Sequence, residues 1–227
     1  ILLALSIWIA RGVFRSLEGL VDGFRRFGKG DFETPIPSAT DDELADVADK
    51  ANHMAEHLQS LDIERTRSTW LKAGSAGLAE AIRGELEPKE VANRTMAFLA
   101  SYLGAPVGAL YYGTPGGPFE ILGRYALPPA SVPNSFAAGE GLVGQAALRQ
   151  QITVVDGAGG LVLRSGLLEH APSTVVFLPL IHAQRVIGVI ELAFVRPTSE
   201  QHTELLLSIR ETVTIALEVA DERGRQA

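Results

Sequence analysis

The most constraining feature of this sequence is a pair of heptad patterns separated by a stretch that cannot be helical. In the first pattern, apolar residues alternate four and three positions apart, at Val13, Leu17, Leu20, Phe24 and Phe27. The second has the same spacing, at Leu44, Val47, Ala51, Met54, Leu58 and Leu61. Such spacing puts the apolar side chains on one stripe of a helix, where they pack as knobs into the holes of a neighbour. The sequence therefore predicts two helices whose apolar stripes each need a partner.

The connector between the two patterns favours one way of pairing these stripes. Gly28–Gly30 is expected to end the first helix, and Pro35 and Pro37 forbid helix in the segment that follows. Thr40 offers an N-cap for the second helix, with Glu43 three residues later. An extended connector of about a dozen residues can span a helix of about 15 residues, which a hairpin does not need. We expect a parallel four-helix bundle made by two copies of the chain; an antiparallel hairpin within one chain is the alternative.

Three short motifs accompany the heptads: Gly30-Asp31 opens the connector, Asp42-Glu43 starts the second helix, and Asn52-x-Met54 lies near its end. With these motifs, residues 11–61 resemble the HAMP domain family, although Ser16 stands where the family often has a proline. The resemblance implies a helical relay that works as a homodimer. The seam residues that it places between the helices are Leu17, Leu20, Phe24, Leu44, Val47, Met54 and Leu58.

The N-terminal residues 1–10 are apolar except for Ser6, and Arg11 and Arg15 follow them. Ten helical residues cover about 15 Å, whereas the hydrocarbon core of a membrane is about 30 Å thick. Positive charge just after an apolar run is typical of the cytoplasmic side of a membrane helix. We expect residues 1–10 to be the end of a transmembrane helix, with the rest of the chain on the cytoplasmic side of the cell membrane. A short buried helix is the alternative.

Residues 62–84 keep a helical character without a clean seam and are expected to form a connecting helix. From residue 85 the pattern changes to mixed helix and strand. The expected strands are 107–113, 118–126, 152–155, 174–181 and 185–195, followed by a final helix after Thr198. Because the links between several of them are short, neighbouring strands are expected to be antiparallel. The fold class is therefore α+β: a helical bundle joined by a helix to an α/β/α domain.

Three segments make residues 85–222 similar to the GAF domain family: 136–146, Phe177-Leu-Pro-Leu180 and 186–192. The resemblance implies a small-molecule pocket between the sheet and a long loop over residues 127–174. Aromatic side chains and a carboxylate in a concavity suit a small organic ligand. The candidate lining residues are Tyr111, Tyr125, Phe136, Phe177 and Glu191. The alternative, that these side chains are ordinary core, has equal weight.

Other motifs point to no chemistry. Gly139, Gly141 and Gly144 match a dinucleotide fingerprint but lack the preceding strand that its mechanism needs. His53 and His57 lie one helical turn apart without a third metal ligand nearby. The chain has no cysteine, and its net charge of −7 disfavours nucleic-acid binding. We therefore expect no catalytic residue, no metal and no cofactor.

The two resemblances together imply signal transduction. The expected parent is a membrane-bound sensor histidine kinase of a two-component system, whose catalytic part lies beyond Ala227. One alternative is a regulatory domain that binds a small molecule, in which the HAMP-like part only dimerises. Another is the input module of a phosphatase or a nucleotide cyclase.

Overall fold

The structure is a computed structural model that describes residues 2–37, 43–113, 117–127, 133–157, 163–164 and 169–226. The chain divides into two compact units, Ile1–Thr69 and Trp70–Ala227. Helix α2 (Glu43–Ala81) contributes to both units, because its last third belongs to the second. The predicted order of helices followed by a mixed domain is confirmed.

The first unit contains α1 (Leu2–Phe27) and the first part of α2. As predicted, α1 ends at the glycines, and a turn over residues 28–30 follows it. A small core forms where the helices and the connector meet, from Leu20, Phe27, Ile36, Ala48, Ala51 and Ala55. The expected N-cap Thr40 and the carboxylates of Asp41 and Asp42 lie outside the described residues.

The connector is fixed between the helices by one side chain and one glycine. The Asn52 amide accepts a hydrogen bond from the Ile36 backbone N–H (2.7 Å) and donates one to the Ile36 carbonyl oxygen (3.0 Å). The Ile36 side chain is buried directly against Gly23, where an added methyl group would overlap it. These contacts hold the connector in an extended path along α1, as the sequence predicted.

In the part of the chain that the structure describes, no helix combines the length and the apolar character needed to cross a membrane.

The second unit is built on a six-stranded antiparallel sheet with the strand order β3-β2-β1-β8-β7-β4. Its strands are β1 (Val107–Tyr112), β2 (Phe119–Tyr125), β3 (Ser135–Phe136), β4 (Thr153–Asp156), β7 (Thr174–His182) and β8 (Arg185–Phe194). A separate two-stranded ribbon joins β5 (Leu163–Arg164) and β6 (Glu169–His170). The five predicted strands are confirmed, whereas β3 and the ribbon are additional.

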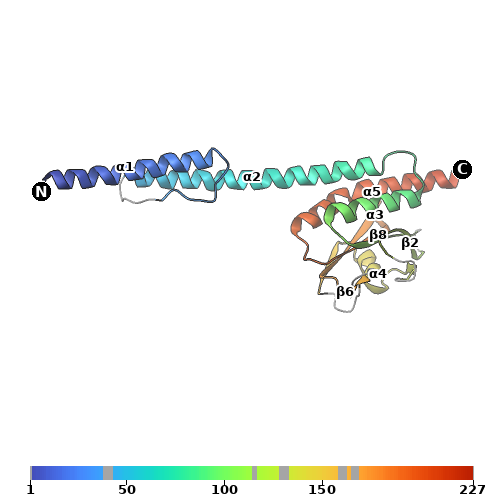
Figure 1. The fold of residues 1–227 in the computed structure, drawn as a ribbon. Helices are drawn as coiled ribbons and strands as arrows, with labels where there is room; N and C mark the ends of the chain where they lie inside the picture. Colours follow the sequence, from blue (N-terminus) through green and yellow to red (C-terminus); the bar gives the residue numbers. More distant parts are fainter. Residues whose placement is uncertain are drawn as a thin grey trace. The chain divides into compact units, whose positions relative to one another are not determined.

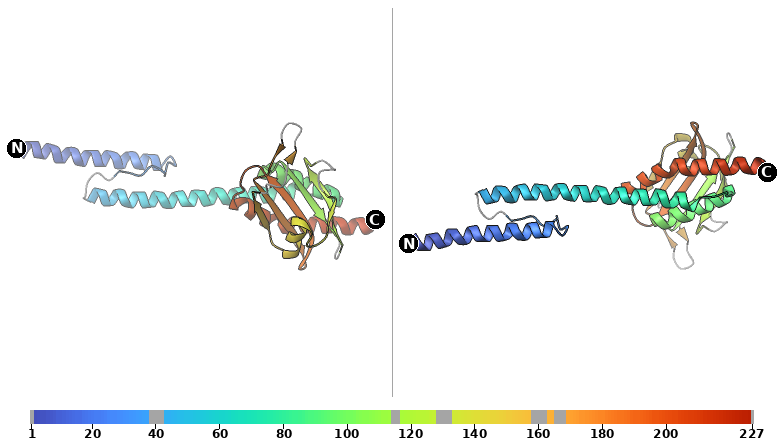
Figure 2. Two further views of the ribbon diagram at one scale, coloured as in Figure 1. Left: turned by 90° about the horizontal axis from the view of Figure 1, so that it is seen from below. Right: turned by 90° about the horizontal axis from the view of Figure 1, so that it is seen from above.

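Helices cover both faces of this sheet (Figure 1). The long α3 (Pro88–Leu103) and α5 (Glu200–Gln226) pack on one face, and the short α4 (Gly141–Arg149) packs on the other (Figure 2). Strands β1, β7 and β8 are buried along most of their length, because alternate side chains enter two separate apolar clusters. Strands that are apolar on both faces therefore have the environment that their sequences predict.

The last third of α2 is an integral part of the second unit. Its Trp70 ring lies 5.1 Å from the Tyr102 ring of α3, and the Tyr102 hydroxyl donates a 2.7 Å hydrogen bond to the Trp70 carbonyl oxygen. Further along, Gly77 allows the Phe98 ring to lie directly on the helix. Leu78 then enters the main core. The predicted connecting helix is therefore continuous with α2 and is fixed to the second unit.

Candidate functional site

The face of the sheet that α4 covers brings four of the five predicted pocket residues together. Strand pairing places Glu191 of β8 opposite Ala109 of β1 on one side and opposite Phe177 of β7 on the other. Tyr111 lies two residues further along β1, on the same face. The Phe136 ring of β3 meets the Tyr111 ring edge-on, with centroids 5.2 Å apart. We call Tyr111, Phe136, Phe177 and Glu191 the inner-face cluster.

Two polar groups of this cluster, the Tyr111 hydroxyl and the Glu191 carboxyl, lie close together on the inner face. The Tyr111 side chain is fully buried, and its hydroxyl has no hydrogen-bond partner of acceptable geometry among the described residues. The Glu191 carboxyl lies close to this hydroxyl and forms no ion pair with any cation in the described part of the chain. A buried polar group without a partner costs free energy, roughly 1–3 kcal/mol, that a bound group can restore.

The electrostatics of the cluster follow from that burial. Burial raises the pKa of Glu191 from 4.5 to about 7, although the nearby Tyr111 hydroxyl lowers it in part. Burial and the Glu191 charge together raise the pKa of Tyr111, whereas the Arg124 guanidinium opposes the shift. The carboxyl is therefore divided between its neutral and charged forms near neutral pH, while the phenol stays protonated.

Tyr125 is not brought together with the other four residues. Leu110 pairs with Gly123 and Tyr111 pairs with Ile121, so Leu122 is an extra residue in β2. This bulge reverses the facing of the residues that follow it. The Tyr125 ring consequently lies on the opposite face of the sheet, where it packs against the apolar core under α3 and α5.

The same bulge brings in a residue that the sequence reasoning missed. Arg124 turns toward the inner-face cluster, and its guanidinium donates a 2.8 Å hydrogen bond to the Asn134 side-chain oxygen. Strict alternation along β2 predicts the opposite facing, so the residue pattern alone gave no signal for Arg124.

The HAMP domain model matches residues 8–60, and the GAF domain model matches residues 85–218, which is more than half of the chain. The chain belongs to the HAMP and GAF domain families. No protein with a curated description matches it.

Solved structures agree with the GAF assignment at the level of the fold. The GAF domain of a phosphoenolpyruvate-protein phosphotransferase from Coxiella burnetii is 14% identical, with a TM-score of 0.58 over 68% of this chain and 96% of that one. The corresponding domain from Acinetobacter is 17% identical, with a TM-score of 0.55 over 66% and 93%. A putative GAF sensor protein from Burkholderia vietnamiensis is 16% identical, with a TM-score of 0.53 over 65% and 93%. At these identities the likeness concerns the fold alone.

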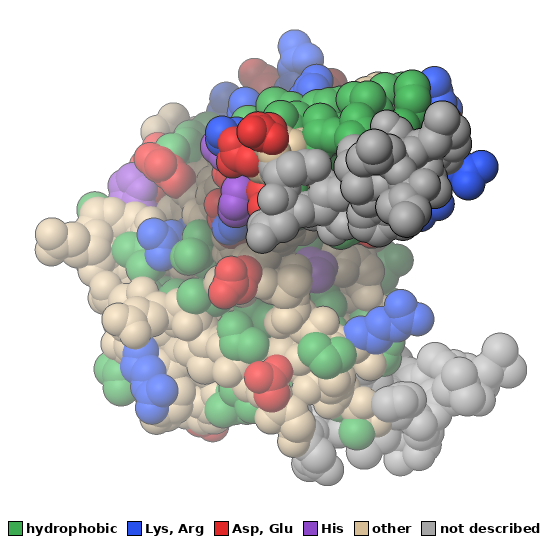
Figure 3. Space-filling model, turned by 90° about the vertical axis from the view of Figure 1, so that its left-hand side faces the viewer, with side chains coloured by type: hydrophobic (Ala, Val, Ile, Leu, Met, Phe, Trp, Pro, Cys, Tyr) green, Lys and Arg blue, Asp and Glu red, His purple; other side chains and the backbone are tan. Residues whose placement is uncertain are grey.

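The predicted seam of the HAMP domain divides into a buried and an exposed part. Leu20 is buried within the chain and Leu44 is half-buried. The exposed large apolar residues of α1 and the first part of α2 have relative exposures between 38% and 68%; they are Val13, Phe14, Leu17, Val21, Phe24, Val47, Met54, Leu58, Leu61 and Ile63. In Figure 3, which faces the N-terminal side, hydrophobic side chains gather along the helices of this domain. Five of the seven predicted seam residues therefore lack cover within one chain.

The glycine motif before α4 is structural. The Glu140 carboxylate accepts a 2.9 Å hydrogen bond from the Ala137 backbone N–H, and the Gly139 N–H donates to the Gly144 carbonyl oxygen (2.8 Å). These bonds close a tight turn that leads into α4, which agrees with the interpretation of the motif as a helix start.

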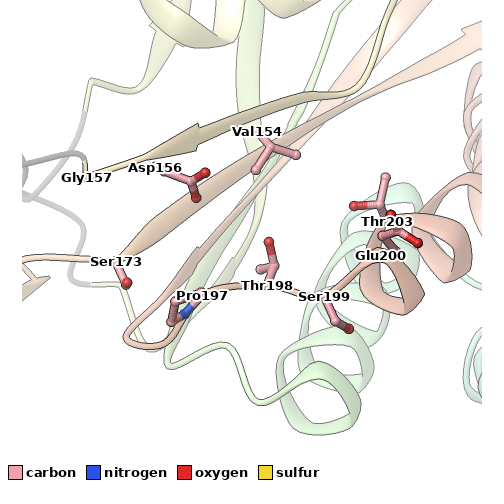
Figure 4. Close-up of a pocket in the computed structure, with 9 residues that line it drawn as sticks. All are labelled: Val154, Asp156, Gly157, Ser173, Pro197, Thr198, Ser199, Glu200 and Thr203. Carbon is pink, nitrogen blue, oxygen red and sulfur yellow. The ribbon is translucent and has the colours of Figure 1, made fainter.

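The GAF domain also has a groove of about 500 Å³ at the open edge of β4, several of whose lining residues are polar (Figure 4). The side chains of Asp156 and Thr198 point toward it, and Glu200 and Thr203 line it from the first turn of α5. The Asp156 carboxylate already accepts a 2.8 Å hydrogen bond from the Thr174 hydroxyl. Among the described residues, neither this groove nor any other place gathers three potential metal ligands.

Proposed function

We propose that this chain is the cytoplasmic relay and sensory input segment of a membrane sensor, in which two copies pair in parallel through their HAMP helices. The observation that carries the proposal is the exposed apolar seam on α1 and α2. Removing apolar surface from water contributes about 25 cal/mol per Å², so the seven exposed side chains of the seam favour a partner strongly. The small core within one chain leaves this surface uncovered.

A second copy of the chain is the partner that fits this surface best. The exposed residues of α2, among them Val47, Met54, Leu58 and Leu61, keep heptad spacing over two heptads. Such a stripe is complementary to an identical stripe on a parallel helix in register. Helix bundles that have two discrete packings can transmit a signal from one end to the other.

The GAF domain is proposed to bind a small organic molecule at the inner-face cluster. Its support is chemical. Among the described residues the buried Tyr111 hydroxyl has no hydrogen-bond partner of acceptable geometry, the half-buried Glu191 forms no ion pair, and the Phe136 and Phe177 rings flank them. A ligand that offers a hydrogen-bond donor to Glu191 and an apolar part to the rings matches these groups.

The parent protein is proposed to be a two-component histidine kinase anchored in the cell membrane through the segment that begins α1. Arg11, Arg15, Arg25 and Arg26 follow the apolar residues 1–10, with the sign expected on the cytoplasmic side. The competing proposal is a regulatory GAF domain for which HAMP only supplies dimerisation. A ligand that binds tightly and leaves the pairing of the HAMP helices unchanged favours the competing proposal.

Disulfide crosslinking tests the proposed dimer, because the chain has no native cysteine. Leu17→Cys and Met54→Cys replace exposed seam residues, and oxidation is expected to join two chains at either position. His53→Cys is the matched control, since this neighbour of the seam is exposed on the outer side of α2 and should stay monomeric under the same conditions. Equal crosslinking at all three positions, or no crosslinking at the two seam positions, would contradict the proposed parallel dimer.

A further inference from the structure

One row of residues across the sheet of the GAF domain carries two opposite charges on the same face. Strand pairing places Arg124 of β2 opposite Ala109 of β1, and Ala109 opposite Glu191 of β8. Residues directly opposite one another in paired strands extend from the same face of the sheet. Ala109 belongs to the apolar cluster of the inner face, so a guanidinium and a carboxylate both extend from that face, with only a methyl group between them along the row.

These two charges do not pair with each other. Neighbouring strands lie about 4.8 Å apart, so Cα atoms two strands apart are separated by about 10 Å. Among the described residues no ion pair joins Arg124 to Glu191, and the guanidinium instead bonds the uncharged Asn134 oxygen at 2.8 Å. Both charged residues are half-buried, so a group from solution can reach each of them. A small molecule that carries one charge of each sign can therefore pair with both.

The Tyr111 hydroxyl lies within electrostatic reach of both charges. Tyr111 is two residues beyond Ala109 in β1 and faces the same side. The Glu191 carboxylate raises the pKa of Tyr111 and the Arg124 guanidinium lowers it. The hydroxyl is fully buried and has no hydrogen-bond partner of acceptable geometry among the described residues. It can therefore donate a hydrogen bond to an anionic oxygen that Arg124 also binds.

Apolar rings border these polar groups. Phe177 of β7 follows Glu191 on the same row, and the Phe136 ring meets the Tyr111 ring edge-on. An occupant that matches the whole cluster consequently combines a cationic nitrogen, an anionic group and an apolar part. A free α-amino acid carries all three on one carbon atom.

We propose that the inner-face cluster and Arg124 bind a zwitterion, a free α-amino acid with an apolar side chain. Its ammonium pairs with Glu191, and its carboxylate pairs with Arg124 and accepts a hydrogen bond from Tyr111. The inference rests on the small-molecule site proposed above and names the class of its ligand. Charge-assisted hydrogen bonds at both ends select for compounds with both charges, because a ligand that lacks one charge leaves one protein group unpaired.

Isothermal titration calorimetry of the full chain tests this class with matched probes. L-Phenylalanine has both charges, 2-phenylethylamine lacks the carboxylate, and 3-phenylpropanoate lacks the ammonium. L-Leucine, 3-methylbutylamine and 4-methylpentanoate form a second set with a smaller apolar part. In at least one set, we expect the amino acid to bind about tenfold more tightly than either analogue.

Two variants separate the roles of the charged residues. Glu191→Gln should weaken binding of both the amino acid and its amine by about tenfold or more. Arg124→Gln should weaken the amino acid to a similar extent and leave the amine unchanged, a difference that a merely structural role of Arg124 would not produce. The matched controls are Glu120→Gln and Arg185→Gln, exposed positions of β2 and β8, which should bind the amino acid as the native chain does.

The outcomes distinguish the inference from the site on which it rests. If an amine binds as tightly as its amino acid and still depends on Glu191, the small-molecule site stands and the zwitterion is wrong. Equal loss of amine and amino-acid binding in Arg124→Gln also overturns the inference. If none of the probes binds the native chain, the inference and the proposed small-molecule site both fail, because the amines carry the donor and the apolar part that this site requires.

Discussion

Individual side chains have two distinct roles in this chain. One fixes the connector of the HAMP domain, and two others form a polar pair in the inner-face cluster of the GAF domain. The Asn52 side-chain amide forms hydrogen bonds with both backbone groups of Ile36, so these groups are satisfied without a neighbouring strand or helix. Tyr111 and Glu191 differ, because among the described residues the buried Tyr111 hydroxyl has no hydrogen-bond partner of acceptable geometry and the half-buried Glu191 forms no ion pair. The first arrangement is typical of a structural position and the second of a binding position.

Replacing Asn52 by alanine is expected to destabilise the HAMP domain. The substitution leaves the half-buried N–H and carbonyl groups of Ile36 without partners, which costs about 1–3 kcal/mol in the free energy of unfolding. Urea denaturation followed by circular dichroism measures the loss. Ser60→Ala is the control, since its hydroxyl bonds only to the exposed Glu56 carbonyl oxygen within the same helix, and it should change the free energy by less than about 0.5 kcal/mol. Equal effects of the two substitutions would contradict the role of Asn52.

The raised pKa of Glu191 predicts that the stability of the GAF domain depends on pH. Its pKa is raised from 4.5 to about 7 on folding, so between these values the folded state binds a proton that the unfolded state has lost. Stability from this group is therefore full below about pH 4.5 and falls as the pH rises to about 7, by at most about 3 kcal/mol. Glu191→Gln should flatten this slope and stabilise the domain at pH 8.

Thermal unfolding at pH 5, 6, 7 and 8 measures that dependence. The control is Glu120→Gln, an exposed carboxylate of β2, which should keep the native slope. A slope that survives in Glu191→Gln would show that other groups cause it.

At the scale of elements, the regular patterns were sufficient to predict the helices and the long strands, whereas the irregular positions were not predicted. Expected strands 174–181 and 185–195 correspond to β7 (Thr174–His182) and β8 (Arg185–Phe194), because their alternate residues enter two cores. The bulge at Leu122 is a local event with no such periodic signal, and it is the reason that Tyr125 faces the helices and Arg124 faces the cluster. β3 escaped prediction because it is two residues long. The hydrogen bonds between Asn52 and Ile36 were not predicted because the two residues are 16 positions apart in the sequence.

The packing of α2 on α3 gives a prediction at this scale. A Cβ atom at residue 77 would lie 2.8 Å from Phe98 Cε2, so Gly77→Ala should force the aromatic stack of Phe98 and Tyr102 to move. We expect a loss of about 1–3 kcal/mol in the free energy of unfolding, even though alanine is the better helix former. Gly224→Ala in α5 is the control, since no atom lies within 4 Å of its added methyl group. Stabilisation by Gly77→Ala, measured by urea denaturation, would show that α2 is not closely packed there.

On the scale of the whole molecule, one helix links the two domains. α2 begins in the HAMP domain and ends within the GAF domain, where Trp70, Gly77 and Leu78 fix it to α3 and the core. In the proposed dimer, a change in the pairing of the HAMP seams reaches the GAF domain through α2. This route requires that two copies lie parallel, with the same residues opposite one another along α2.

Spin-label distances between two copies test that requirement most directly. Asp46→Cys, His53→Cys and Ser60→Cys place one nitroxide at a time on the exposed outer side of α2, seven residues apart, in a chain with no other cysteine. In a parallel dimer in register, pulsed electron paramagnetic resonance should give three similar interchain distances. Because seven residues span about 10 Å of helix, an antiparallel dimer would instead change the distance by up to about 21 Å from one site to the next. Unequal distances of that size, or no defined interchain distance at any site, would contradict the parallel relay.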